Sequence, residues 1–275
     1  MTTPTTHTIA VVSPLGGVGR TTLTAHLATL AAAQDLPCLA IDLCAENMLG
    51  RHLGAQQATE AGWATLAAQQ QWWGSAALGN SDAVDLLPFG SASAAELALL
   101  QRAWAQSGDW LDCRLKALEV PAGSLIFLDT PAWPEPLACQ ALTVADTVLV
   151  VLESSARACH AQALVAQALA MAPAAAHCAI VINRIDPRRP SQRSALETLR
   201  QQWGALLLPY AVHEDENITQ ASAHATSVCA WAPHAQSSHD LQGISQWLLK
   251  PWPALPEKAA EPAPAHAPLS LTPQP

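Results

Sequence analysis

The sequence is short of charged residues, and of basic residues most of all. Asp, Glu, Lys and Arg make up 13% of the 275 residues, about half the usual share, and the formal net charge is -9. Proteins that bind nucleic acid or anionic membranes without sequence preference need a basic surface. The composition therefore argues against both partners and favours proteins or nucleotides.

Paired cysteines are missing as well. The sequence has seven cysteines, an odd number, and none of them forms a C-x-x-C pair. They stand at positions 38, 44, 113, 139, 159, 178 and 229. This scatter argues against a zinc site and a disulfide framework, and it is typical of a reducing compartment.

Long apolar segments are also absent. No run of about 18 apolar residues, the length that spans a bilayer, occurs in the sequence. Residues 1–7 have neither the basic residues nor the apolar core of a signal peptide. We therefore expect a cytoplasmic protein, recruited to the inner membrane only through partners.

The chain is nevertheless rich in apolar residues. Half of its residues are hydrophobic, which is enough for one large α/β domain or two small ones. Ten tryptophans stand against one tyrosine and two phenylalanines. Trp104 and Trp203 fit core positions of predicted helices, whereas Trp72–Trp73 and Trp247–Trp252 fit a core or a protein interface equally well.

A phosphate-binding loop is predicted near the start of the sequence. The apolar run Ile9–Ser13 has strand length and stops at Pro14, and glycine-rich residues 16–19 then lead into a helix-forming sequence from Leu23. Glycines let backbone N–H groups converge on an anion, and the positive end of the following helix points to the same place. This order of elements indicates a site for nucleotide phosphates.

The loop departs from the general pattern G-x-x-x-x-G-K-S/T at two positions. Pro14 stands at the first glycine and Arg20 at the lysine, whereas Thr21 keeps the hydroxyl that binds Mg²⁺. A glycine-rich turn without a ligand is the alternative interpretation. The order of strand, loop and helix favours the phosphate loop.

Two acidic residues end strands that are predicted to be buried. Asp42 closes residues 37–42, and Asp129 closes residues 125–129. Uninterrupted apolar runs are typical of parallel strands, whose carboxyl ends form the ligand edge of an open sheet. We expect both carboxylates beside the loop, where they would orient Mg²⁺ or its water. Taken singly, each could instead cap the next helix.

A second acidic segment has a different interpretation. In residues 213–216 a histidine precedes three acidic residues, which could imitate a metal cluster. We interpret it as a solvated acidic turn, because carboxylates there would favour the start of the helix predicted from Asn217.

Strand and helix patterns alternate along the chain, which predicts an α/β fold with a mainly parallel, twisted sheet and helices on both faces. We expect one P-loop NTPase domain over residues 8–250, between a disordered extension, 1–7, and a disordered Pro/Ala-rich tail, 251–275. The predicted strands are 8–13, 37–42, 84–90, 125–131, 147–152, 178–184 and 205–209. The predicted helices follow the loop to about residue 33 and then cover 45–71, 93–118, 158–171, 191–203, 217–224 and 241–249.

Residues 16–22 resemble the deviant phosphate loop K-G-G-V-G-K-T-T of the MinD/ParA ATPases. Asp42, the Asp129–Pro131 motif and residues 181–184 stand where that family has its strand-end aspartate, its magnesium-side motif and its adenine-contacting segment. A narrower resemblance is to the BcsQ (YhjQ) family, MinD-like accessory proteins of bacterial cellulose secretion. It covers about residues 9–249 and is carried by Asp42–Leu49, Gly62–Ala64 and Leu86–Gly90.

The resemblance implies ATP and Mg²⁺ as cofactors, and it assigns contacts to matching positions. Those implied for the nucleotide are Gly16, Gly17, Val18, Gly19, Arg20, Thr21 and Thr22 at the phosphates, Asn183 at the adenine edge, and Asn47 in the switch segment near the other subunit. Those implied for Mg²⁺, partly through water, are Thr21, Asp42 and Asp129. The implied partners are a second copy in a face-to-face homodimer, a small BcsR-like subunit and the inner-membrane cellulose synthase complex.

Three departures from the family pattern fall on catalytic groups. Leu15 replaces the signature lysine that reaches the other subunit's phosphates, and Arg20 replaces the loop lysine. Cys44 stands where partition ATPases generally have a second aspartate, and we interpret it as a small buried residue. We expect ATP to be held tightly and hydrolysed weakly or not at all, with Asp42 and Asp129 as the remaining catalytic candidates.

Two other functions stay open at this point. A ParA-type partitioning or positioning ATPase with another cargo shares the loop, but the acidic balance argues against DNA binding. A metabolic enzyme of the same loop class is the other alternative. A dethiobiotin-synthetase-like ligase would need a small-molecule pocket, and a relative of the nitrogenase iron protein would need paired cysteines that this sequence does not place.

Overall fold

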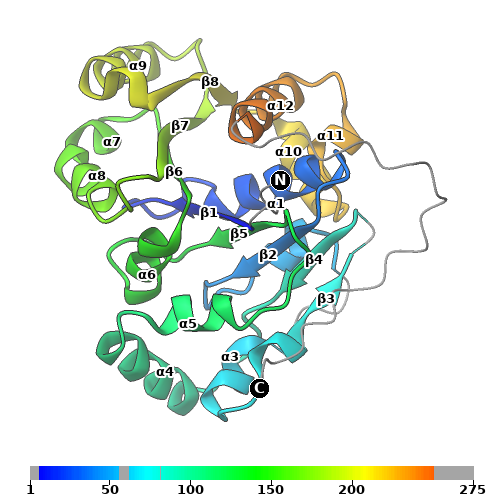
Figure 1. Ribbon diagram of the computed structural model, residues 1–275. Coiled ribbons are helices and arrows are strands. Elements are labelled where there is room, and N and C mark those ends of the chain that lie inside the picture. Colours follow the sequence, from blue (N-terminus) through cyan, green and yellow to red (C-terminus); the bar gives the residue numbers. More distant parts are fainter. Residues whose placement is uncertain (1–5, 56–61, 81, 251–275) are drawn as a thin grey trace, which may run out of the picture.

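The computed structural model describes residues 6–55, 62–80 and 82–250. In these residues eight strands form one sheet with helices on both sides (Figure 1). This confirms the predicted α/β fold with a mainly parallel sheet. Residues 1–5 of the predicted disordered extension, 1–7, and the predicted tail, 251–275, lie outside the described residues. The extension was predicted too long, because β1 already begins at His7, one residue before the predicted strand.

The strand order is β3-β4-β2-β5-β1-β6-β7-β8. Every neighbouring pair is parallel except β3 with β4. The first strand therefore lies inside the sheet, between β5 and β6. The strands are β1 (His7–Val12), β2 (Cys38–Asp42), β3 (Leu78–Gly79), β4 (Val84–Leu87), β5 (Leu125–Asp129), β6 (Thr147–Glu153), β7 (His177–Ile185) and β8 (Leu207–His213).

The central strands follow from the apolar runs of the sequence. Every residue of β2, β4 and β5 is buried. A strand that has helices on both faces needs apolar side chains in both directions, which is why these runs do not alternate. The pairing of such strands brings their polar last residues to one edge of the sheet.

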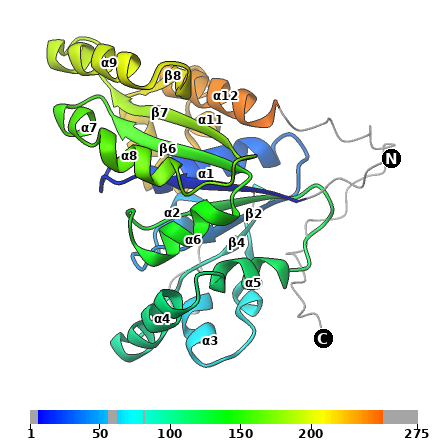
Figure 2. The ribbon, with the colours of Figure 1, turned by 60° about the vertical axis from the view of Figure 1, so that its left-hand side comes forward.

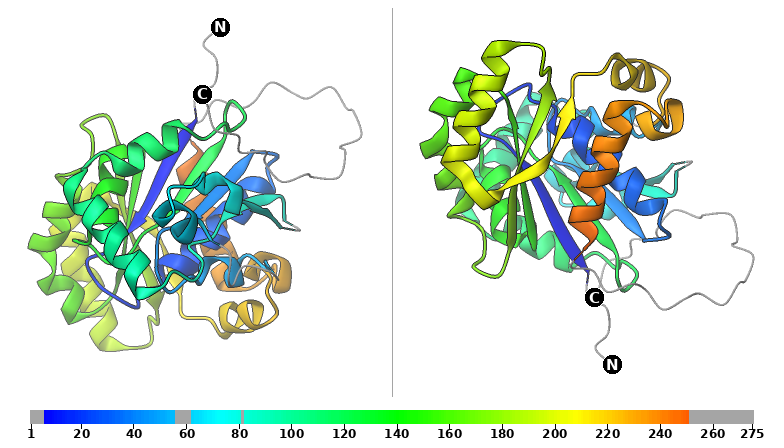
Figure 3. Two further views of the ribbon diagram at one scale, coloured as in Figure 1. Left: turned by 90° about the horizontal axis from the view of Figure 1, so that it is seen from below. Right: turned by 90° about the horizontal axis from the view of Figure 1, so that it is seen from above.

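Helices cover both faces of the sheet, as Figures 2 and 3 show. On one face α12 packs against α1 and β8, and on the other α6 packs against β1, α5 and α8. None of the helices in the described ranges has the length and apolar character of a transmembrane segment. The helices are α1 (Arg20–Ala32), α2 (Leu49–His52), α3 (Trp63–Ala68), α4 (Ala94–Gln106), α5 (Trp110–Lys116), α6 (Pro136–Val144), α7 (Ala156–His160), α8 (Gln162–Leu169), α9 (Pro190–Trp203), α10 (Glu216–Ala223), α11 (Val228–Trp231) and α12 (Gln236–Leu249), with 3-10 turns η1 (Trp73–Ala76) and η2 (Gly204–Leu206).

Two long predicted helices are interrupted. The helix expected over 93–118 starts as predicted, with Ser93 as its N-cap, but divides into α4 and α5 around Gly108. Gln140 of α6 stabilises the break, because its amide N–H groups donate to two carbonyls at the end of α4 and its Oε1 accepts from Leu111 N at 2.8 Å. The helix expected over 158–171 likewise divides into α7 and α8.

The prediction of a helix over residues 45–71 was largely wrong. Its described parts hold only the short helices α2 and α3, separated from each other by extended and turn backbone at Gly54 and Gly62. At Gly62 a Cβ would lie 2.2 Å from Phe89 O, so this backbone is held against the segment after β4. Residues 56–61 lie outside the described ranges.

The last strand is longer than predicted. β8 continues past Pro209 to His213, because it lies at the edge of the sheet and a proline there breaks no central ladder. The sequence pattern gave no indication of α6 or of the two-residue strand β3.

An aromatic cluster packs around Trp63 and answers one open question about the tryptophans. The rings of Trp73, Phe89, Trp104 and Trp110 have their centroids 5.7, 4.9, 6.2 and 5.8 Å from that of Trp63. Trp63 and Trp73 are fully buried. The Trp104 prediction is confirmed, and Trp73 belongs to the core and not to an exposed surface.

Candidate nucleotide site

The glycine-rich loop joins β1 to α1 at the carboxyl edge of the sheet. Gly17 and Gly19 have φ angles of 75° and 89°, in the left-handed region that glycine adopts without strain. At Gly19 a Cβ would lie 2.3 Å from Asn183 Nδ2, so no larger residue fits there. Gly19 is also the N-cap of α1, and Arg20 is therefore the first helical residue.

Three successive carbonyls of the loop accept hydrogen bonds from side chains that come from distant parts of the chain. The bonds are Arg157 Nη2 to Gly16 O at 3.2 Å, Arg184 Nη1 to Gly17 O at 3.0 Å, and Asn183 Nδ2 to Val18 O at 2.8 Å. The loop is thus held by β6–α7 and β7 as well as by its own turns.

Arg20 and Leu15 take up the positions that matter for the loop's chemistry. Arg20 Nη1 donates to Ser13 O at 3.3 Å, so its guanidinium lies back along the end of β1. Leu15 packs into the apolar core and is only 9% exposed. The loop consequently has a positively charged side chain at position 20, as the sequence indicates, and none at position 15.

The predicted carboxylates come together at the same edge. Asp42 and Asp129 are register partners in the parallel pairing of β2 with β5, and both are fully buried. Asp42 accepts hydrogen bonds from Cys44 N through Oδ1 and from Leu49 N through Oδ2, each at 2.9 Å. Neither oxygen of Asp129 has a partner at hydrogen-bond geometry among the described residues, although the Thr21 hydroxyl lies close enough to interact with the carboxyl group. The site therefore has one satisfied carboxylate and one unsatisfied carboxylate side by side.

Burial raises the pKa of both carboxyl groups above the ordinary value. At Asp129 the neighbouring charge of Asp42 raises the pKa further, whereas the Thr21 hydroxyl and the Arg20 guanidinium lower it. At Asp42 the backbone N–H groups of Leu49 and Cys44 oppose the effect of burial on the pKa. The two carboxyl groups lie beside the loop, and both can be ionised there only when a positive charge is close to them.

Cys44 completes this cluster. One ligand atom each of Asp42, Cys44 and Asp129 lies within 4.8 Å of the other two. The Cys44 thiol donates to Asp129 O at 3.6 Å, and burial raises its pKa, so it stays protonated. The interpretation of Cys44 as a small buried residue fits this geometry.

The donor set suits a magnesium ion better than a softer metal. Mg²⁺ prefers carboxylate, hydroxyl and water oxygens, and Asp129 offers two buried oxygens that lack other partners in the described chain. The Thr21 hydroxyl is close enough to Asp129 to lower its pKa, so a third oxygen ligand is at hand. A protonated thiol is a poor ligand, which argues against zinc at this place.

Trp63 holds the backbone of Asp42 in place. Its Nε1 donates to Asp42 O at 2.7 Å, and its backbone N donates to Pro88 O at 2.9 Å. Asp42–Leu49, Gly62–Ala64 and Leu86–Gly90, the three segments that carried the narrower resemblance, therefore meet at one residue.

A cleft lies beside α1. It is lined by Thr22 of α1, by Asn183 and Arg184 of β7, and by residues 212–215 at the end of β8. Asn183 and Thr22 therefore line the same cleft. The amide N–H group of Asn183 is taken by the loop carbonyl, and reading of the adenine edge stays a prediction.

The remaining predicted residues lie as follows. Asn47, with a φ of 50°, lines a hollow together with Arg51 and Phe89, on the segment between β2 and α2. The acidic segment 213–216 is a helix start, because Asp215 caps α10 by accepting from Asn217 N at 2.9 Å. His213 is paired with Asp240 at 2.8 Å, and no metal cluster is present there in the described residues.

Sequence reasoning missed Glu153 and Arg157, and it included Arg184 only as part of the implied adenine-contacting segment 181–184. Glu153 forms ion pairs with Arg157 at 3.8 Å and with Arg184 at 3.5 Å. Glu153 ends β6, and Arg184 lies near the end of β7. Glu153 directly follows the apolar strand residues 148–152 at the carboxyl edge, the same signal that revealed Asp42 and Asp129.

Comparison with known proteins identifies the family. A family model described as cellulose biosynthesis protein BcsQ matches residues 7–249. The chain belongs to the BcsQ family. BcsQ of Salmonella typhi is 31% identical over 238 residues, which cover 85% of this chain and 90% of that protein. The family resemblance found in the sequence is thereby confirmed.

The BcsQ fold is also that of MinD-type and ParA-type ATPases. MinD of Pyrococcus horikoshii, solved with Mg-ADP, superposes with a TM-score of 0.71 at 18% identity, covering 89% of this chain and 96% of that chain. An ATP complex of a Cyanothece McdA variant gives a TM-score of 0.73 at 17% identity, covering 89% of this chain and 97% of that chain. At these identities the likeness concerns the fold.

Proposed function

We propose that this BcsQ-family chain binds MgATP and acts as a nucleotide-stabilised dimer that helps to assemble or localise a bacterial cellulose synthase complex. The observation that carries the nucleotide part is the position of the buried pair Asp42 and Asp129 next to the glycine loop, with Asp129 lacking hydrogen-bond partners among the described residues. Loop, hydroxyl and carboxylates together form a complete set of groups for a nucleotide phosphate with its metal.

The residues have distinct roles in this proposal. The N–H groups of residues 16–22 and the start of α1 bind the phosphates, and Arg20 adds positive charge. Thr21, Asp42 and Asp129 would hold Mg²⁺, directly or through its waters. Bound there, the ion would neutralise charge on the phosphates and on the two carboxylates. The cleft lined by Thr22 and Asn183 receives the base.

Weak or absent hydrolysis is part of the proposal. The side chain at position 15 is apolar and 9% exposed, so it cannot donate to a phosphate of another subunit. The Cys44 thiol has a raised pKa and is a poor substitute for a carboxylate that positions water. These changes spare the groups that bind phosphate.

The cellulose part rests on membership of the BcsQ family. We propose that the ATP-bound homodimer recruits a small BcsR-like subunit and, through such partners, reaches the inner-membrane synthase from the cytoplasm. Protein partners also suit the formal net charge of -9.

Calorimetry of the purified full chain tests nucleotide binding. We expect ATP to bind in the presence of Mg²⁺ and to bind at least about tenfold more weakly in EDTA, because the carboxylates then repel the phosphates. Absence of binding under both conditions would overturn the proposal. Phosphate release measured on the same sample should be far slower than that of an active partition ATPase, and a comparable rate would refute the hydrolysis claim.

Co-purification tests the assembly role. The small partner subunit should be retained by the tagged chain with MgATP, and light scattering should give the mass of a dimer under that condition. A monomer with saturating MgATP would contradict the dimer. The partitioning alternative predicts salt-dependent binding to DNA, which we do not expect from an acidic chain.

A further inference from the structure

The peptide groups of the phosphate loop have a defined orientation. Gly16, Gly17 and Val18 each have a carbonyl that accepts a side-chain hydrogen bond. In a planar trans peptide the N–H group points away from the carbonyl. The N–H groups of the next three residues, 17–19, therefore lie on the side of the loop opposite the bonded side chains.

Gly16 and Gly17 give this part of the loop conformational freedom that these bonds restrict. A Cβ at Gly16 or Gly17 would meet no atom within 4 Å, so the space on that side of the backbone is open. Glycine also has the largest conformational freedom of any residue. Without the bonds to their carbonyls, these two peptides would be free to turn.

The two arginines are themselves held in place. Glu153 pairs with both of them, and it is the register partner of Asn183 in the pairing of β6 with β7. Arg184 has a φ of 56°, a left-handed conformation that arginine rarely adopts, and its guanidinium bonds the loop carbonyl from there.

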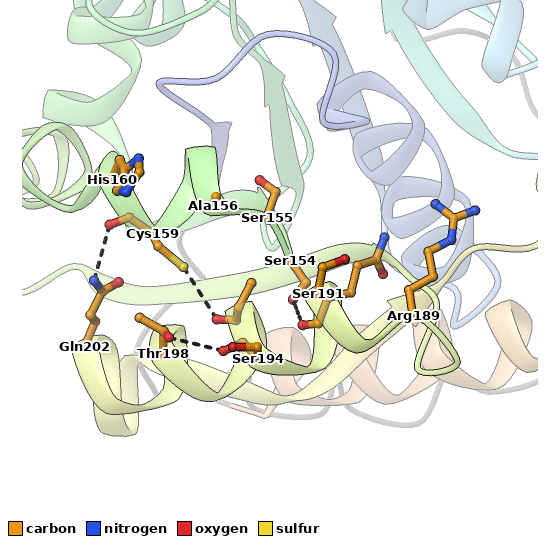
Figure 4. Close-up of a pocket in the computed structure, with 12 residues that line it drawn as sticks. Ser154, Ser155, Ala156, Cys159, His160, Arg189, Ser191, Ser194, Thr198 and Gln202 are labelled. Atoms are coloured by element: carbon orange, nitrogen blue, oxygen red, sulfur yellow. Dashed lines mark hydrogen bonds between the residues drawn. The ribbon is translucent and has the colours of Figure 1, made fainter.

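Arg157 is carried by a short helix with its own anchors. Figure 4 shows α7 beside α9, where Cys159 Sγ donates to Ala195 O at 3.6 Å and Gln202 Nε2 donates to Cys159 O at 3.2 Å. Ser155 caps α7 by accepting a hydrogen bond from Ala158 N. Arg157 thus extends to the loop from a fixed base.

We propose that Arg157 and Arg184, joined by Glu153, form an arginine clamp that grips the loop carbonyls and so keeps the loop N–H groups turned toward the phosphate of a bound nucleotide. They are positioning residues outside the loop, and the phosphate affinity of the loop depends on them. The part that concerns ATP rests on the proposed function, whereas the effect on the loop is present without a ligand.

The test compares single and double glutamine variants, R157Q and R184Q, with R102Q as the matched control. Arg102 is an exposed residue of α4, so R102Q removes the same charge away from the loop. Backbone 15N order parameters of residues 16–19, which report the motion of each N–H group, are measured by NMR without nucleotide. MgATP affinity and thermal unfolding are then measured on the same proteins.

We expect the order parameters of the loop amides to fall below about 0.6 in the double variant and MgATP affinity to fall about tenfold. R102Q should leave both values unchanged. The lysine variants R157K and R184K keep the charge and one donor, and they should recover part of the lost affinity. Melting temperatures should stay close to that of the unmodified chain, because both arginines are half-exposed.

Two results would overturn the clamp. Unchanged order parameters of the loop in the double variant would do so, whatever happens to MgATP affinity, since the arginines would then act on phosphate directly or not at all. Unchanged affinity with lower order parameters would show that the orientation of the loop does not matter for binding. If the unmodified chain fails to bind MgATP, the proposed function fails, and the order parameters still decide whether the arginines hold the loop.

Discussion

Asp42 and Asp129 lie opposite each other in register on two neighbouring parallel strands, and neither side chain reaches solvent. Parallel strands that end in acidic residues at the same level bring two charges together without help from any loop. The cost of this arrangement is repulsion and desolvation in the free protein. The arrangement therefore connects stability to the binding of a cation.

Replacing Asp129 by asparagine should separate these two effects. D129N replaces a buried carboxyl group whose pKa is raised by burial and by Asp42, which makes folding costly near neutral pH, so we expect the ligand-free protein to gain about 1 kcal/mol or more of stability. We expect MgATP affinity to fall at least about tenfold. Urea unfolding and calorimetry measure the two values. D112N, at a half-exposed residue of α5 that pairs with Lys116 away from the loop, is the control, and unchanged affinity in D129N would speak against a metal role.

Trp63 should prove more important for stability than its neighbours in the same cluster. W63F removes the hydrogen bond to Asp42 O and leaves that buried carbonyl without its donor, at a cost of about 2–3 kcal/mol. Trp104 is the matched control, because its Nε1 has no hydrogen-bond partner among the described residues. W104F should therefore cost less in urea unfolding. Equal losses for the two variants would show that ring packing alone matters.

Leu15 should limit turnover. L15K places a cation where the loop has none, and we expect steady-state phosphate release to rise at least about tenfold. The lysine would stabilise the negative charge that develops on the phosphates as the bond to the terminal phosphate breaks. The rise should depend on protein concentration if the lysine acts across a dimer. L15M, which conserves apolar volume, serves as the control. A folded, ATP-bound L15K protein with no faster release would refute this explanation.

His52 should make the protein less stable in acid. Burial and the nearby His26 lower the pKa of His52 from 6.5 to about 4. Because the pKa of His52 is lower in the folded than in the unfolded state, its contribution to the free energy of unfolding is complete above pH 6.5. This contribution is lost as the pH falls from 6.5 towards 4. The loss should be on the order of 2 kcal/mol.

The H52Q variant isolates that contribution. Urea unfolding of both proteins between pH 7.5 and pH 4.5, values chosen to bracket about two pH units of the His52 window, gives the difference. H52Q keeps a partner for Ser222 Oγ, which lies 3.2 Å from His52 Nδ1, but it has no proton to take up. Parallel pH profiles for the two proteins would contradict the assignment.

The sheet and its edge could be predicted from the sequence because their causes are local. Uninterrupted apolar runs indicate strands that are buried on both faces, and the first polar residue after such a run must lie at the edge of the sheet. Asp42, Asp129 and the glycine loop were placed together by this reasoning alone. The order of the strands was not needed for this prediction, because the carboxyl ends of all strands in a parallel sheet share one edge.

What could not be predicted depends on contacts between distant residues. Gln140 caps the break between α4 and α5 from a helix about thirty residues away, so helical propensity over 93–118 did not reveal the break. Arg157 bonds a carbonyl at Gly16, 141 positions earlier in the chain, and its neighbours read simply as the start of a helix. Propensity and spacing carry no information about such partners.

The aromatic cluster also provides an intrinsic fluorescence probe. Trp63 lies with its ring centroid within 6.2 Å of those of Trp73, Trp104 and Trp110, so excitation absorbed by these indoles is shared among neighbouring rings. The Trp63 N–H is bonded to the backbone of Asp42, and any shift of that strand end changes the polarity around the emitting ring. Intrinsic fluorescence can therefore follow events at the carboxylate pair in the unlabelled chain.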